Sequence, residues 1–66
     1  MKPYIIVTRV EALEALLVKR ELPMHYLQRR FKEEHNLDFS IEEISSGKPF
    51  VWIASNDGFK ITVKEK

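Results

Sequence analysis

Residues 50–63 read FVWIASNDGFKITV and contain the strongest local structural signal in the chain. Two runs rich in β-branched and aromatic residues flank Asn56-Asp57-Gly58, a tripeptide typical of tight turns between strands. The pattern predicts a β-hairpin, with one strand over residues 50–54 and a return strand over residues 59–63. Because side chains alternate between the two faces of a strand, the length of the turn decides which residues reach the core.

Two turn lengths are compatible with the sequence, and they place Trp52 on opposite faces of the sheet. If Asn56-Asp57-Gly58 form the loop, Ser55 lies opposite Phe59 and Trp52 lies away from the core. If only Asp57-Gly58 form the loop, the pairing shifts by one residue and Trp52 becomes core. We favour the three-residue loop because its core face is apolar at every strand position except the one beside the turn. Its core face carries Val51, Ile53, Phe59, Ile61 and Val63. Its other face carries Phe50, Trp52, Ala54, Lys60, Thr62 and Lys64.

Upstream of the hairpin, the apolar run over residues 4–8 predicts a further strand, buried on both sides. Thr8 and Glu11 have the spacing of a capping box, which predicts that a helix begins after Thr8. That helix ends before Pro23, because the residue preceding a proline is pushed out of helical dihedrals. Its predicted buried stripe consists of Val10, Leu13, Leu16 and Leu17.

A second helix is expected to begin at Pro23, which suits the first helical position. Its buried stripe is Met24, Leu27 and Phe31, and Asn36 is expected to end it in the left-handed conformation. Leu37, Phe39 and Ile41 then alternate, which predicts another strand.

The predicted fold class is therefore α+β, with the order β-α-α-β-β-β. Residues 1–66 are expected to form a single small domain. Two helices pack on one face of a mainly antiparallel four-stranded sheet.

Composition narrows the function classes. The chain of 66 residues has no cysteine, which excludes disulfides, thiolate zinc sites and cysteine nucleophiles. Its 11 basic and 10 acidic residues give a net charge of +1, so there is no bulk attraction to nucleic acid or to membranes. No apolar stretch approaches the ~18 residues of a membrane helix, and we expect a cytoplasmic protein. A core of this size contributes only about 3–5 kcal/mol, which makes a homodimer a reasonable expectation.

We find no convergent set of catalytic or metal-binding residues. His25 and His35 lie ten residues apart on one predicted helix, about 15 Å along its axis, and cannot share a metal. Ser46-Gly47-Lys48 lacks the upstream glycine of a phosphate-binding loop. The acidic pairs at 33–34 and 42–43 are adjacent in sequence, so their members point in different directions. We therefore expect no enzyme activity, no cofactor, no metal and no small-molecule substrate.

The leading hypothesis is a protein-interaction module of the regulator or inhibitor type. In the favoured register, Phe50, Trp52, Lys60 and Thr62 lie on the sheet face without helices. Aromatic side chains framed by polar groups are typical anchors of protein interfaces. This face would bind a protein partner or a second copy of the chain.

The alternative hypothesis is a nucleic-acid-binding regulator that uses the second helix. His25, Gln28, Arg29 and Lys32 fall in or beside one sector of that helix, and such side chains contact phosphates and base edges. Glu33 lies four residues after Arg29 and can pair with it, which weakens this hypothesis.

Overall fold

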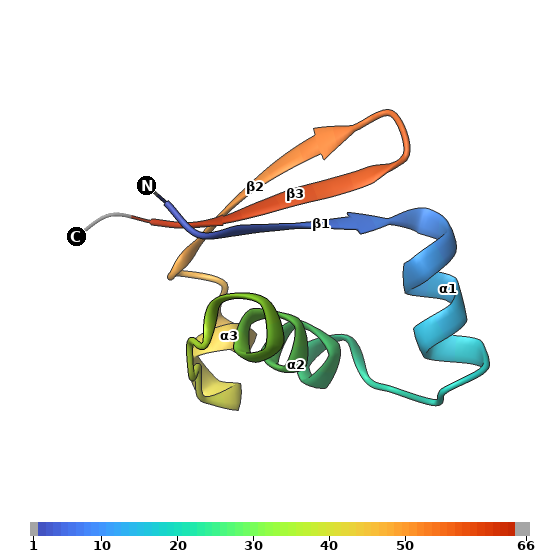
Figure 1. The fold of residues 1–66 in the computed structure, drawn as a ribbon, viewed down its shortest axis with the longest axis horizontal. Helices are drawn as coiled ribbons and strands as arrows, with labels where there is room; N and C mark the ends of the chain where they lie inside the picture. Colours follow the sequence, from blue (N-terminus) through green and yellow to red (C-terminus); the bar gives the residue numbers. More distant parts are fainter. Residues whose placement is uncertain (1, 65–66) are drawn as a thin grey trace.

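The computed structural model describes residues 2–64 and has mixed helical and strand structure (Figure 1). In chain order, the elements are β1 (Tyr4–Thr8), α1 (Arg9–Leu17), α2 (Pro23–His35), α3 (Ile41–Ser46), β2 (Phe50–Ser55) and β3 (Gly58–Val63). The strands form one antiparallel sheet in the order β1-β3-β2. The α+β class is confirmed, whereas the predicted four-stranded sheet with two helices is wrong.

The predicted strand over residues 37–41 is the source of that error. Leu37 and Phe39 belong to a connection without regular secondary structure, and both are partly buried against the core, which explains their alternation. Ile41 begins α3 instead. Ser40 caps this helix: its hydroxyl accepts from the Glu43 amide at 3.1 Å, while its own amide donates to the Glu43 carboxylate at 3.0 Å.

The beginning of α1 and both ends of α2 follow from the predicted signals, whereas α1 ends at Leu17 and not at the residue before Pro23 as predicted. The Thr8 hydroxyl accepts a hydrogen bond from the Glu11 amide at 3.1 Å and caps α1. Pro23 lies in the first turn of α2, where its missing amide proton costs nothing. Asn36 ends α2 with φ of 55°, the left-handed conformation that was predicted.

The densest part of the core lies where α2 and α3 meet the beginning of β2. Phe31 is completely buried and stacks on Phe50, with ring centroids 5.2 Å apart and an interplanar angle of 7°. Phe39 packs edge-on against both rings. The remaining buried residues are Ile5, Val7, Ala15, Tyr26, Leu27, Ile44 and Ile61.

The hairpin has neither of the two registers considered from the sequence. Ser55 pairs with Gly58, so Asn56 and Asp57 alone form the turn, and Trp52 lies opposite Ile61. The physical reason is Gly58, which belongs to β3 rather than to the turn. A Cβ atom built there would lie 2.0 Å from the carbonyl oxygen of Val7, so only glycine allows β1 and β3 to approach this closely.

This register reverses the predicted faces of β2. Phe50, Trp52 and Ala54 lie on the face of the sheet that the helices cover, together with Phe59 and Ile61. The opposite face of the sheet is open and carries four exposed apolar side chains around the central strand. They are Tyr4, Ile6, Val51 and Ile53.

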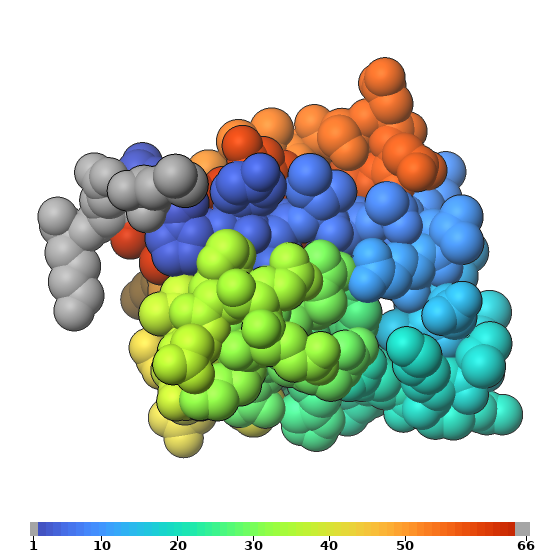
Figure 2. All heavy atoms as spheres, in the orientation of Figure 1, coloured from blue at the N-terminus to red at the C-terminus, as the bar shows by residue number. Residues whose placement is uncertain are grey.

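The space-filling view places the atoms of β1 between those of the β2–β3 hairpin and those of α2 (Figure 2). One edge strand of the sheet, β1, therefore lies beside the helices, whereas β2 lies at the far edge (Figure 1). Over residues 2–64, no helix has the length and apolar character needed to cross a membrane.

Candidate functional site

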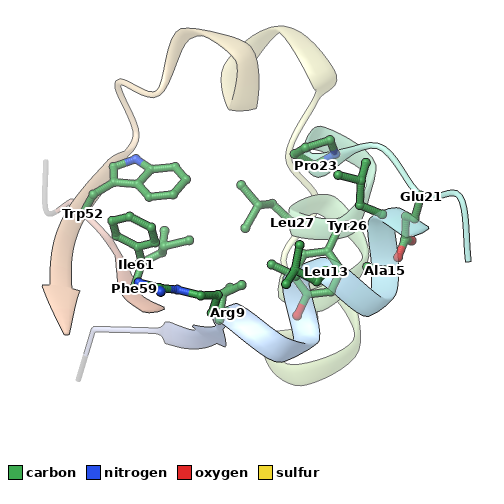
Figure 3. A pocket seen from close by; sticks show the side chains of 13 residues that line it. Arg9, Leu13, Ala15, Glu21, Pro23, Tyr26, Leu27, Trp52, Phe59 and Ile61 are labelled. Carbon is green, nitrogen blue, oxygen red and sulfur yellow. The ribbon is translucent and has the colours of Figure 1, made fainter. Parts of the chain in front are cut away.

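An apolar groove opens between α1, the beginning of α2 and the β2–β3 hairpin (Figure 3). Its volume is about 300 Å³, at the lower end of the range for ligand pockets. Its walls include Leu13, Leu16, Tyr26, Leu27, Trp52 and Phe59. Tyr26 and Leu27 are buried and form its floor, so the groove ends on the protein core.

Trp52 and Phe59 form the hairpin wall of the groove. Their rings meet edge to face, with centroids 6.0 Å apart and an interplanar angle of 80°. Both side chains are 47% exposed although they lie on the face of the sheet that the helices cover. The helices therefore leave this end of the sheet uncovered, and Figure 3 shows both rings facing the space before Leu27.

Helix α1 forms the opposite wall, and Ala15 is its only buried residue. Leu13 and Leu16, which line the groove, are 49% and 46% exposed. The predicted buried stripe of α1 is therefore wrong. Further apolar side chains continue the exposed surface around this helix and into the connection that follows it: Val10, Leu17, Val18 and Leu22.

The two charged residues that line the groove have different surroundings. Arg9 makes no ion pair with any residue in the described part of the chain, so its guanidinium is available at the rim. Glu21 accepts two hydrogen bonds of 2.8 Å from Arg29. These hydrogen bonds hold the pKa of Glu21 below its ordinary value. The Glu21 carboxylate is therefore ionised, and both of its oxygens are hydrogen-bonded to Arg29.

Arg30 of α2 positions the α1 wall of the groove through its side-chain contacts. Its guanidinium contacts the carboxylates of Glu11 and Glu34 and the hydroxyl of Tyr26. It also donates to the carbonyl of Ile6 at 3.2 Å, so a single side chain joins α1, α2 and β1. Burial, together with the nearby Glu11 carboxylate, raises the pKa of Tyr26 to about 12. Tyr26 therefore remains a neutral hydrogen-bonding group at physiological pH.

The structure separates the four residues predicted to form one partner-binding face. Phe50 is only 3% exposed and belongs to the aromatic core. Trp52 lies in the groove, whereas Lys60 and Thr62 lie on the opposite, open face of the sheet. The Lys60 ammonium sits 4.5 Å from the centroid of the Tyr4 ring. The prediction that these four residues share one face was wrong, because it depended on a hairpin register that the structure does not have.

The alternative site on α2 consists mostly of side chains with intramolecular partners. Arg29 pairs with Glu21 and also with Glu33 at 3.0 Å. Lys32 contacts Asp38 at 3.2 Å, and Gln28 donates to the carbonyl of Phe39 at 2.9 Å. Nucleic acid would have to displace these contacts, so the alternative stays a prediction without support from the geometry.

Comparison with known proteins does not assign the chain to a family. No family model matches the chain, and no significant match was found among curated proteins or among solved structures. Within residues 2–64, no group of three or more His, Asp or Glu side chains is placed to hold a metal ion.

The sequence carried a signal for the groove that the helical pattern alone did not reveal. Apolar residues at positions 10, 13, 16, 17 and 18 span more of the α1 surface than one buried stripe requires. A helix of nine residues cannot bury all of them against a three-stranded sheet. Such an excess indicates either an open groove or a partner.

Proposed function

We propose that this protein is a non-enzymatic interaction module that binds an apolar segment of a protein partner in the groove between α1 and the β2–β3 hairpin. The observation that supports the proposal most directly is the half-exposed aromatic pair of Trp52 and Phe59, placed opposite Leu13 and Leu16. Tryptophan in a partly formed pocket is the kind of side chain that dominates interface energetics.

A protein segment fits this surface better than a small ligand does. The groove accommodates only a few apolar side chains, yet exposed apolar residues continue beyond it along α1. An extended or helical segment can cover both parts, with anchor side chains in the groove and further contacts on α1. A small molecule confined to the groove would leave Leu17 and Val18 in water.

Charge adds one requirement for the partner. Arg9 lines the groove and makes no ion pair with residues 2–64, whereas the Glu21 carboxylate is already bound by Arg29. A carboxylate on the bound segment, next to its apolar anchors, would meet the free guanidinium. The favoured partner segment is therefore apolar with an acidic residue at one side.

The test uses two neighbouring leucines of α1. Leu16→Gln removes an apolar wall of the groove, whereas Leu17→Gln makes the same chemical change at a more exposed position that does not line the groove. A photo-crosslinking amino acid at position 13 is introduced into the wild-type chain and into both variants in producing cells. Cross-linked proteins are then identified by mass spectrometry.

We expect one protein to cross-link to the wild-type chain. Leu17→Gln, which loses only a peripheral contact on α1, should weaken this cross-link slightly, whereas Leu16→Gln should weaken it about tenfold or more, as for an interface anchor. Synthetic peptides from the cross-linked segment must then quench or shift the Trp52 fluorescence. A cross-link that is unaffected by Leu16→Gln, or a peptide that leaves Trp52 unperturbed, would contradict the proposal. Saturation of the groove by a small apolar metabolite instead of a protein would also contradict it.

The expected cytoplasmic location belongs to the same proposal. Cell fractionation of the natural host tests it, since the protein must be recovered with its partner in the cytoplasmic fraction. Recovery in another compartment would contradict it.

A further inference from the structure

The two edges of the sheet are protected very differently. At the β1 edge, α2 supplies hydrogen bonds to outward-facing backbone groups. The carbonyl of Tyr4 accepts from His35 Nε2 at 2.6 Å, and the carbonyl of Ile6 accepts from Arg30 at 3.2 Å. Covering an edge with a helix is one of the ways in which proteins prevent unwanted strand pairing.

The β2 edge has no such cover. The Lys64 amide donates to the carbonyl of Pro49 at 2.7 Å, and the antiparallel alternation then turns Val51 and Ile53 toward β3. The backbone groups of Trp52 and Ala54 must therefore point outward. In the described residues, neither N–H nor C=O of these two residues has a hydrogen-bond partner.

The sequence of β2 also lacks the usual devices against edge pairing. Its six residues, Phe50–Ser55, contain no charge and no proline. Apart from Phe50, they are exposed, with apolar side chains on both faces of the sheet. A long, uncharged and apolar edge strand of this kind is a template for another strand.

We propose that β2 pairs antiparallel with β2 of a second copy of this chain, which joins the two three-stranded sheets into one of six strands. The two-fold axis passes through Ile53, so that Ile53 lies opposite the partner's Ile53 on the open face. Trp52 then lies opposite the partner's Ala54 on the groove face, a large side chain beside a small one. The pairing avoids Phe50, whose amide already donates to the carbonyl of Gly47.

Charge favours this antiparallel arrangement. Lys48 precedes β2, whereas Asp57 lies in the turn at its other end, and neither makes an ion pair with the described residues. Antiparallel pairing brings Lys48 of each copy toward Asp57 of the other, while parallel pairing would place like charges together. The net charge of +1 gives almost no repulsion between two copies.

The expected dimer is weak. Pairing over residues 51–55 extends for about 17 Å, and a strip of this length covers less than the ~800 Å² per partner of a standard interface. The experiment must therefore cross-link the weak dimer covalently as well as measure its mass in solution. This inference does not depend on the proposed function, because the groove variants leave the outward-facing backbone of β2 unchanged.

The absence of cysteine makes a site-directed disulfide test possible. In the proposed register, Ile53 forms a non-hydrogen-bonded pair with its own copy, with Cα atoms about 4.5 Å apart, which suits a disulfide. Val51 lies on the same face of the same strand, but the two copies of this residue would be about 13 Å apart. Ile53→Cys and Val51→Cys are therefore a matched pair.

We expect Ile53→Cys to form a disulfide-linked dimer about tenfold faster than Val51→Cys under mild oxidation, because pre-association raises the effective thiol concentration. Sedimentation of the unmodified chain should show a mass that rises with concentration above 7.8 kDa. Ala54→Pro, which removes the outward N–H without touching the β2–β3 ladder, should stay monomeric, whereas Ala54→Val should not.

Equal cross-linking rates for the two cysteine variants would overturn the proposal, as would a wild-type chain that remains monomeric at millimolar concentration. If Ala54→Pro fails to fold, hydrogen exchange of the wild-type chain tests the strand pairing instead. Protection of Trp52 and Ala54 amides must then increase with protein concentration, and unchanged protection overturns the proposal. Leu16→Gln must dimerise like wild type, so failure of the groove proposal is distinguishable from failure of this one.

Discussion

Gly58 is the residue on which the contact between β1 and β3 depends. Any Cβ at this position would meet the Val7 carbonyl oxygen at 2.0 Å and the Thr8 Cα at 2.9 Å, both of which are backbone atoms. We predict that Gly58→Ala lowers the free energy of unfolding by about 3 kcal/mol, since the two strands must separate to admit the methyl group. Urea unfolding followed by circular dichroism measures this loss.

Gly47 provides the matched control for that substitution. It ends α3 with φ of 68°, but no atom lies within 4 Å of where its Cβ would be. Gly47→Ala should therefore cost only about 1 kcal/mol, the price of a left-handed conformation for alanine. Equal losses in the two variants would show that backbone conformation, rather than close approach, makes Gly58 necessary.

The same glycine shows why the register could not be predicted from the sequence. Asn56-Asp57-Gly58 was correctly identified as the site of a turn, because these residue types favour turns wherever they occur. Which of them belongs to the turn depends on how close β1 passes to Gly58. That distance is a property of the assembled sheet and not of the tripeptide, so both predicted faces of β2 were wrong.

In the connection between α1 and α2, Glu21 forms a bidentate ion pair with Arg29 of α2. Because Arg29 lowers the pKa of Glu21 from its ordinary value of 4.5, the unfolded chain binds more protons than the folded one just below that value. The pair's contribution is therefore complete above pH 4.5 and disappears as the pH falls through the lowered pKa.

We predict that Glu21→Gln destabilises the protein by about 1 kcal/mol at pH 7, and that its difference from wild type shrinks in acid. Glu33→Gln removes the other partner of Arg29, which is far more exposed, and should have a smaller effect at pH 7. Unfolding curves for the three proteins at a series of pH values from 7 into strong acid test this. A difference for Glu21→Gln that never shrinks as the pH falls would contradict an electrostatic origin.

Helix α3 shows how one local signal can outweigh another. Ser40 and Glu43 have the same capping-box spacing as Thr8 and Glu11, which correctly predicted the beginning of α1. The alternation of Leu37 and Phe39 favoured a strand instead. Alternation only requires that every second side chain face the core, and an irregular connection that packs against the core satisfies that requirement without strand pairing.

The aromatic core is concentrated at one end of the protein. The rings of Phe31, Phe39 and Phe50 fill the end near α3, whereas the groove occupies the end near α1. Helix α1 buries only Ala15, so few apolar contacts oppose its local opening. We predict that amides of α1 exchange with solvent at least about tenfold faster than those of α2, as measured by hydrogen exchange and NMR.

Glu11 determines whether α1 opens on its own. Its carboxylate accepts from Arg30 at 2.7 Å and is the polar contact that ties α1 to α2. Glu11→Gln should speed amide hydrogen exchange in α1 and leave the exchange rate of the Phe31 amide in α2 unchanged. Glu14→Gln, on the same helix, is the control. It should change neither rate, because the Glu14 carboxylate only approaches Lys19 at 4.0 Å. Equal acceleration of exchange in α1 and α2 would mean that the two helices open together.

If α1 opens alone, a partner bound in the groove must slow the exchange of α1 amides in proportion to the partner's affinity. The exchange rate of these amides is then a direct measure of groove occupancy.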